Sequence, residues 1–150
     1  MSVVKITGVR KAISNIVKVT TATSRALTIA TLQGGLWIEA SAKRNAPVKY
    51  GNLKGSIFTR GQRGAGTKPS FPQSTPELQE GLHQVNTAVD KILKKANVPT
   101  VTVGVGANYG IYVEELHKTN GKFLARAIKS NKDKIEKNFK SKLKKAMKIL

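Results

Sequence analysis

The side chains best suited to chemistry are two neighbouring carboxylates, Glu114 and Glu115, and two histidines, His83 and His117. Two carboxylates that face one another can serve as general acid and general base. Glu114 and Glu115, however, belong to a stretch, 111–116, whose composition predicts a strand, and neighbours on a strand point to opposite faces. We therefore expect salt bridges with nearby lysines rather than a catalytic pair.

Neither the histidines nor the glycine-rich segment forms a convincing ligand motif. His83 has only Glu80 at a helical spacing, and the chain has no cysteine, which excludes disulfides and cysteine-based metal sites. The glycines Gly104, Gly106 and Gly110 lack the lysine, the following Ser or Thr and the helix that a phosphate-binding loop requires. With no nucleophile beside a base, the sequence predicts neither an enzyme nor a bound cofactor.

Net charge is the most pronounced property of the composition. The 150 residues include 27 Lys and Arg against 8 Asp and Glu, a formal net charge of +19. The stretch 121–150 alone holds 11 of these basic residues and 2 acids. Such a charge favours polyanionic partners, either nucleic acid or acidic protein surfaces. No apolar run approaches the roughly 18 residues of a membrane-spanning helix, so a membrane partner is not expected.

Hydrophobic periodicity predicts helices at both ends and in the middle of a single domain, 1–150. The first helix is expected over 5–45, either bent at its glycine pair or divided into two, and ending before a proline. The second begins at the capping pair Thr75-Pro76 and runs to about residue 96. The third, over 121–150, is amphipathic and basic, and its length suggests that it projects beyond the domain.

Strands are expected over 56–60, 100–106 and 111–116, where β-branched and aromatic residues cluster or alternate with small ones. The last two are predicted to form a hairpin, and the first to add a third strand. The helices and this small, mostly antiparallel sheet define an α+β fold.

The sequence "NAPVKYGNLKGSI", which starts at Asn45, joins the first helix to the first strand. Pro47 is expected to end the helix, and Gly51 to provide a turn with positive φ. The segment thus predicts a helix-to-strand elbow made of six residues: Pro47, Gly51, Leu53, Gly55, Ser56 and Ile57.

A Gly/Pro loop follows over 61–75, "GQRGAGTKPSFPQST", in which no regular structure is expected. Phe71 could anchor a partner or tuck onto its own domain. Basic and aromatic residues of the elbow and loop are candidates for contact with another subunit, a partner or DNA: Lys49, Tyr50, Lys54, Arg60, Arg63, Lys68 and Phe71.

The elbow carries a family resemblance. The stretch "AKRNAPVKYGNLKGSI", from Ala42, resembles a signature of the neck, or tail-completion, proteins of long-tailed phages, a family that includes proteins described as minor tail components. The matching positions are Ala46, Pro47, Val48, Gly51, Leu53, Lys54, Ser56 and Ile57, with Tyr50 in place of the usual threonine.

A second block, "NYGIYVEELHKTNGKFLARAI", is similar to the same family's Tyr-x-x-Tyr-Val-Glu segment, glycine turn and Phe-Leu-x-x-Ala. The family's Phe-Gly-Thr is replaced here by Glu115-Leu116-His117, and its proline by Lys122. The matching residues are Tyr109, Tyr112, Val113, Glu114, Phe123, Leu124 and Ala127.

The resemblance implies a structural virion protein without catalytic, cofactor or metal residues. It implies a homo-oligomeric ring, commonly hexameric, in the neck at the head–tail junction, made in the host bacterial cytoplasm. Its partners would be the head connector or adaptor proteins on one side and the tail-terminator or tail-tube proteins on the other. Contact with packaged DNA would be non-specific.

Two alternatives remain open from the sequence. Within the same machinery, the chain could be a tail terminator or another minor tail protein. From another class, its charge is compatible with a basic nucleic-acid-binding protein that contacts phosphates without reading sequence.

Overall fold

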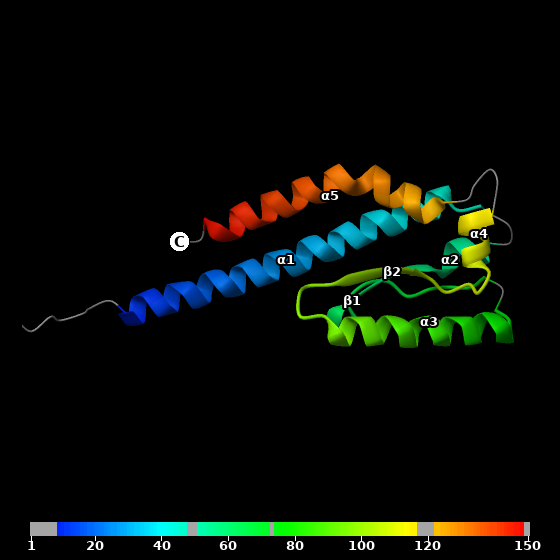
Figure 1. Ribbon diagram of the computed structural model, residues 1–150, viewed down its shortest axis with the longest axis horizontal. Helices are drawn as coiled ribbons and strands as arrows, with labels where there is room; N and C mark the ends of the chain where they lie inside the picture. The colour runs from blue at the N-terminus through cyan, green and yellow to red at the C-terminus, as the bar shows by residue number, and fades with distance from the viewer. Residues whose placement is uncertain (1–8, 48–50, 73, 117–121, 149–150) are drawn as a thin grey trace, which may run out of the picture.

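The structure is a computed structural model that describes residues 9–47, 51–72, 74–116 and 122–148. It confirms the α+β class, with a long N-terminal helix, a helix in the middle, a small sheet and a long basic C-terminal helix (Figure 1). The elements, in chain order, are α1 (Val9–Asn45), α2 (Asn52–Ser56), β1 (Ile57–Gly61), the 3-10 turn η1 (Gln62–Gly64), α3 (Pro76–Lys95), β2 (Val101–Val105), α4 (Gly110–Leu116) and α5 (Phe123–Met147).

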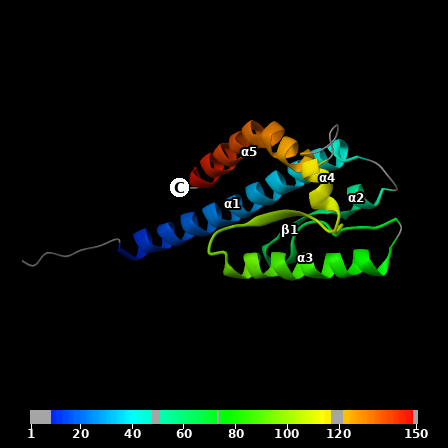
Figure 2. The ribbon, with the colours of Figure 1, turned by 45° about the vertical axis from the view of Figure 1, so that its right-hand side comes forward.

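Helix α1 is the central element of a layered arrangement. α5 packs along one side of it, the sheet packs on another, and α3 covers the far side of the sheet (Figures 1 and 2). α2 and α4 lie together at the end where α1 finishes and α5 begins. The buried core therefore sits at one end of an elongated molecule, and the two long helices extend past the sheet at the other.

The sheet has two antiparallel strands, with Ile57 opposite Val105 and Gly61 opposite Val101. β1 lies between α1 and α3, and Ile57, Phe58 and Thr59 are almost fully buried. The predicted strands 56–60 and 100–106 are thus confirmed within one residue at each end. The predicted pairing is wrong, because 100–106 pairs with the first strand and not with 111–116.

The predicted strand 111–116 is helix α4. Its composition favours a strand, but the turn before it is tightly closed, with Gly110 N–H donating to Ala107 O at 2.9 Å. A Cβ on Gly110 would lie 2.7 Å from Val105 Cγ1, so the chain leaves the sheet through a position that only glycine fits well. The helical turn that follows directs Val113 toward the core.

Helix α1 is a single helix, so a division into two is wrong, and Asn45 ends it before Pro47 as predicted. Its two central glycines face two neighbouring sides of the helix, the sheet and α5. A Cβ on Gly35 would lie 2.6 Å from Val101 Cγ1 and 2.8 Å from Thr59 Cγ2, whereas one on Gly34 would lie at an ordinary 3.4 Å from Ile135. The sheet therefore approaches α1 more closely than α5 does.

Helix α5 runs antiparallel to α1. Asn138 Nδ2 donates to Gln33 Oε1 at 3.2 Å, and the Ser41 and Ser130 hydroxyls lie 3.4 Å apart. The buried seam runs through Phe123, Ala127, Asn131 and Ala146, whereas Ile128 is 55% exposed. Of the predicted range 121–150, positions 121, 149 and 150 lie outside the described residues. The end of α5 projects past the sheet as predicted, but α1 accompanies it (Figure 1).

The loop 61–75 folds back on its own domain. It contains the turn η1, an isolated bridge between Arg60 and Gly66, and a hydrogen bond from Ser70 N–H to Gly55 O at 2.8 Å. The prediction of no regular structure is therefore wrong for its first part. The start of α3 is as predicted, because the Thr75 side chain accepts from Leu78 N–H and Pro76 is the first helical residue.

The glycine pair of α1 gives a matched test of this packing. Gly35→Ala should lower the free energy of unfolding by about 1–2 kcal/mol, because crowding against the sheet outweighs the gain in helix propensity. Gly34→Ala, which has room beside Ile135, should leave stability unchanged or raise it by up to about 1 kcal/mol. Urea unfolding of both variants measures the difference, and equal stabilities would contradict the close approach of the sheet.

Candidate assembly surfaces

The elbow is built on two glycines with different tasks. Gly51 has φ 74°, the left-handed conformation predicted for it, and starts the short helix α2, which sequence reasoning missed. Gly55 lies under the returning loop, where a Cβ would sit 2.1 Å from the backbone oxygen of Ser70. The Ser56 hydroxyl donates to Leu53 O at 2.8 Å and closes α2. The elbow therefore fixes α1, the strand and the loop against one another.

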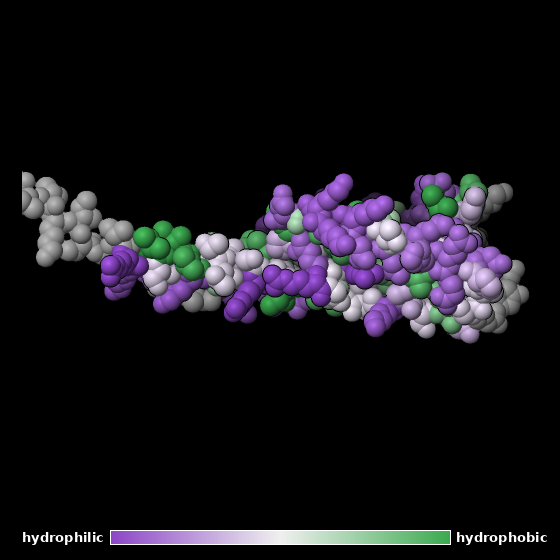
Figure 3. Space-filling model, turned by 90° about the horizontal axis from the view of Figure 1, so that it is seen from below, coloured by the Kyte–Doolittle hydropathy of each residue, from purple (hydrophilic) through white to green (hydrophobic). Residues whose placement is uncertain are grey.

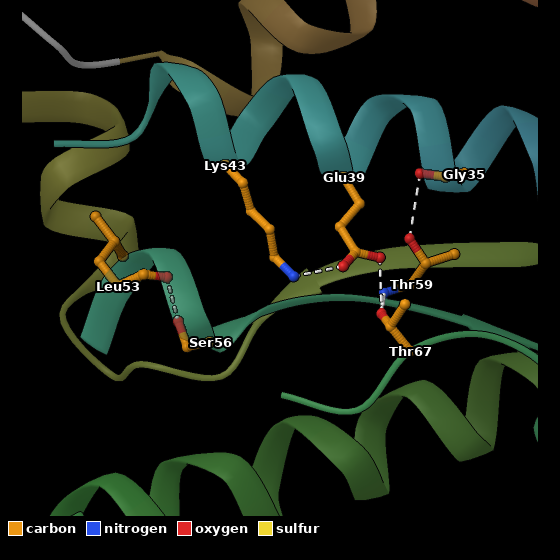
Figure 4. A network of polar contacts seen from close by, with 7 residues as sticks. All are labelled: Gly35, Glu39, Lys43, Leu53, Ser56, Thr59 and Thr67. Carbon is orange, nitrogen blue, oxygen red and sulfur yellow. Dashed lines mark hydrogen bonds and ion pairs between the residues drawn. The ribbon is translucent and has the colours of Figure 1, made fainter. Parts of the chain in front are cut away.

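A buried carboxylate that sequence reasoning missed ties the same elements together (Figure 4). Glu39, on α1, is 4% exposed. Its Oε1 accepts from Lys43 Nζ at 2.6 Å, and its Oε2 accepts from the Thr67 hydroxyl at 2.7 Å. Thr67 Oγ1 in turn accepts from the N–H of Thr59 at 2.9 Å. The network connects α1 to the loop and to β1.

The environment of Glu39 lowers its pKa from the ordinary value of 4.5. Burial alone is the largest single influence and raises the pKa. Hydrogen bonds from Lys43 and Thr67, the nearby Thr59 hydroxyl and the positive charge of Lys43 together outweigh burial. The carboxylate is thus ionised and fully committed to holding the fold, and it is not available as a general base.

Glu114, from the second sequence block, is a helix cap rather than a partner of lysines. Its Oε2 and Oε1 accept the N–H groups of Leu124 and Ala125, each at 3.0 Å, in the first turn of α5. A carboxylate there satisfies unpaired donors and the positive end of the helix dipole. The strand argument against a Glu114–Glu115 pair was wrong in its geometry, since both residues lie on α4.

The two sequence blocks meet in one buried cluster. Leu53 and Ile57 of the elbow share it with Phe123 and Ala127 of the second block, and Val113 and Leu124 pack against it. Residues far apart in the chain thus build a single end of the molecule. Tyr109 and Tyr112, also of the second block, are instead 36% and 63% exposed.

The predicted contact residues divide into three groups. Arg60 is used within the domain, with hydrogen bonding to Asn86 and an ion pair to Asp90, and Phe71 packs on the core instead of standing free. Lys54, Arg63 and Lys68 are exposed and available. Lys49 and Tyr50 lie outside the described residues.

The outer face of α5 is strongly basic. Between Phe123 and Met147 the chain has nine Lys and Arg and two acids, and most of these side chains are exposed. Lys134 Nζ lies 4.1 Å from the centre of the Trp37 ring, a cation–π contact between α5 and α1. The exposed surface of α5 is therefore positively charged along its length.

Among the described residues, no three His, Asp or Glu side chains gather in a way that could hold a metal ion. His83 is exposed on α3, and His117 lies outside the described residues. None of the described helices has the length and apolar character needed to cross a membrane.

No family model, no curated protein and no solved structure matches the chain.

The lowered pKa of Glu39 predicts a pH-dependent contribution to stability. The ionised side chain stabilises the fold above the unfolded-state pKa near 4.5, and this contribution is lost as the pH falls through the lower folded-state pKa. Glu39→Gln should therefore lower the free energy of unfolding by about 1–3 kcal/mol at neutral pH. The difference from wild type should shrink below pH 4.5.

Urea unfolding across this pH range measures the effect. Glu80→Gln, on the exposed face of α3, makes the same change in net charge and serves as the control. A difference between wild type and Glu39→Gln that stays constant with pH would contradict the ionised network.

The cap on α5 gives a second matched pair. Glu114→Gln should lower the free energy of unfolding by about 1–2 kcal/mol, because charge-assisted bonds to the first turn of α5 are weakened. Glu115→Gln, at the neighbouring exposed position, should change it by less than about 0.5 kcal/mol. Thermal or urea unfolding measures both, and equal effects would contradict a capping role.

Proposed function

We propose that this chain is a structural virion protein of a phage neck, where copies of it form a ring that joins the head connector to the tail. The observation that carries the proposal is the meeting of the two resembling blocks in one buried cluster, made by Leu53, Ile57, Phe123 and Ala127. Glu114, also of the second block, caps α5. These matching residues are thus building elements, as expected of an assembly protein.

The exposed apolar residues support assembly into a homo-oligomer. The family resemblance implies that this oligomer is a hexamer. Large hydrophobic side chains remain uncovered near both ends of the molecule, among them Ile13, Ile16, Tyr112 and Leu116. Such exposure is expected of a subunit whose apolar side chains are covered by neighbouring subunits in an assembly.

The basic face of α5 supports a polyanionic neighbour on the ring. An acidic surface of the connector or of a tail-terminator or tail-tube protein would suit it, and so would the phosphates of exiting DNA. The chain would be made in the host cytoplasm and reside in the virion. A tail terminator or other minor tail protein is the alternative within the same machinery.

A non-specific nucleic-acid-binding protein is the second candidate function, and the charge of α5 is the observation that favours it. Such a protein should bind duplex DNA with an affinity that falls steeply with salt, since many phosphates are neutralised. A neck protein needs no such affinity.

Electron microscopy of lysates from the encoding phage, with this gene deleted, tests the proposal. DNA-filled heads beside separate, finished tails are expected, because the junction would lack its ring. Supplying the wild-type gene in trans should restore joined particles. Supplying Leu53→Asp should not, since a buried charge in the elbow disrupts the fold.

Two other outcomes would overturn this assignment. Missing tails, or tails of abnormal length, would move the protein into the tail itself. Intact infectious particles would exclude a structural role and favour the nucleic-acid-binding alternative.

A further inference from the structure

The N-terminal part of α1 has no partner among the described residues. The pairs Gln33–Asn138 and Ser41–Ser130 set an antiparallel register that places Met147, the end of α5, near Ser24. The preceding residues, 9–23, which we call the arm, extend past α5 and the sheet (Figures 1 and 2). At about 1.5 Å per residue the arm is roughly 22 Å long.

The arm presents an apolar stripe. Ile13, Ile16 and Val17 are spaced for one helix face and are 56%, 65% and 57% exposed. The same face, followed along the helix, includes Gly35 and Ala42, which pack in the core. Figure 3 shows hydrophobic side chains gathered on this end of α1, beside hydrophilic ones at its tip. The helix face that packs in the core further along α1 is thus also apolar in the arm, where it is exposed to solvent. An exposed apolar face of this kind is typical of an interface.

A second uncovered apolar surface lies at the opposite end of the molecule (Figure 1). We call it the α4 end; Ile111, Tyr112 and Leu116 are its main apolar residues, and they are 62%, 63% and 70% exposed. Beside them is a hollow of about 430 Å³ between α3, β2, α4 and α5, whose apolar lining includes Val85 and Leu124. This end can receive the side chains of an apolar helix.

The two surfaces differ in charge. The arm carries Arg10, Lys11 and Lys18, and no acid occurs on α1 before Glu39. The α4 end carries the exposed Glu115, and no Lys or Arg occurs over 96–116. In a chain with a net charge of +19 this is an unusual stretch. Although Lys122 lies beside its end, α4 itself offers the arm an exposed carboxylate and no basic side chain.

We propose that the arm of one copy docks on the α4 end of the next copy. Arm-to-arm pairing would bring like positive charges together, and pairing of two α4 ends would bring two Glu115 carboxylates together. Charge therefore favours the head-to-tail contact. Such a heterologous contact generates a closed ring when its rotation closes. The inference rests on the proposed ring and names the surfaces that form it.

Thiol cross-linking tests the contact directly, because the chain has no cysteine of its own. Ile16→Cys and Leu116→Cys proteins, both changed at exposed positions, are mixed and treated with a short bismaleimide, which tolerates an imperfect fit. Ile92→Cys, 53% exposed on α3, replaces either partner as the control. The Ile16→Cys with Leu116→Cys product should exceed both homodimers and the control by about tenfold, the ratio that 1.4 kcal/mol of preference gives.

Predominance of Ile16→Cys homodimers, or a mixed product no greater than the control, would overturn the proposal. A second experiment uses Ile16→Asp and Leu116→Asp, each of which should associate at least about tenfold more weakly than wild type in sedimentation. Their mixture should form a dimer and no larger species, because one intact arm and one intact α4 end remain. Recovery of large assemblies in the mixture would also overturn it.

The outcome is separable from that of the proposed function. Separate heads and tails in the deletion lysate without the head-to-tail cross-link would leave the neck role intact and refute these surfaces. Normal particles from the phage that lacks the gene, together with a positive cross-link, would support these surfaces and refute the neck role.

Discussion

The close approach of the sheet to α1 is the constraint on which the rest of the fold depends. Gly35 leaves no space for a Cβ between α1 and the side chains of Val101 and Thr59, and its carbonyl accepts the Thr59 hydroxyl at 3.1 Å. With the sheet held this close, Glu39 reaches Thr67 and fixes the loop. α5 then packs on the neighbouring side of α1, beside Gly34.

Two local devices at the same end of the molecule hold this arrangement in register. The elbow places the strand under α1, with Gly55 pressed against the backbone of Ser70. Glu114 places the start of α5 by accepting two N–H groups of its first turn. Glu114 is of a type that could do chemistry, but both of its carboxylate oxygens are engaged in capping α5. Among the described residues, apolar side chains at the ends and basic side chains along α5 remain exposed, and the proposed assembly role rests on them.

Much of the fold could be predicted because its signals are local. The Thr75-Pro76 cap, the stop before Pro47 and the positive φ of Gly51 follow from the chemistry of a few adjacent residues. The helix α4 could not, because its strand-like composition is overridden by a tight turn at Gly110 and by the core beneath Val113. The Glu39 network was hidden because Thr67 is 28 residues away in the chain. The resembling blocks were found from sequence, but their convergence required the structure.

Electron cryo-microscopy of the neck in intact particles of the encoding phage tests the central claim most directly. The account predicts a ring between the head connector and the tail, in which each subunit contains the paired helices α1 and α5 and lays residues 9–23 on α4 of its neighbour. A junction whose density cannot accommodate this helix pair, or particles in which the chain is absent, would contradict it.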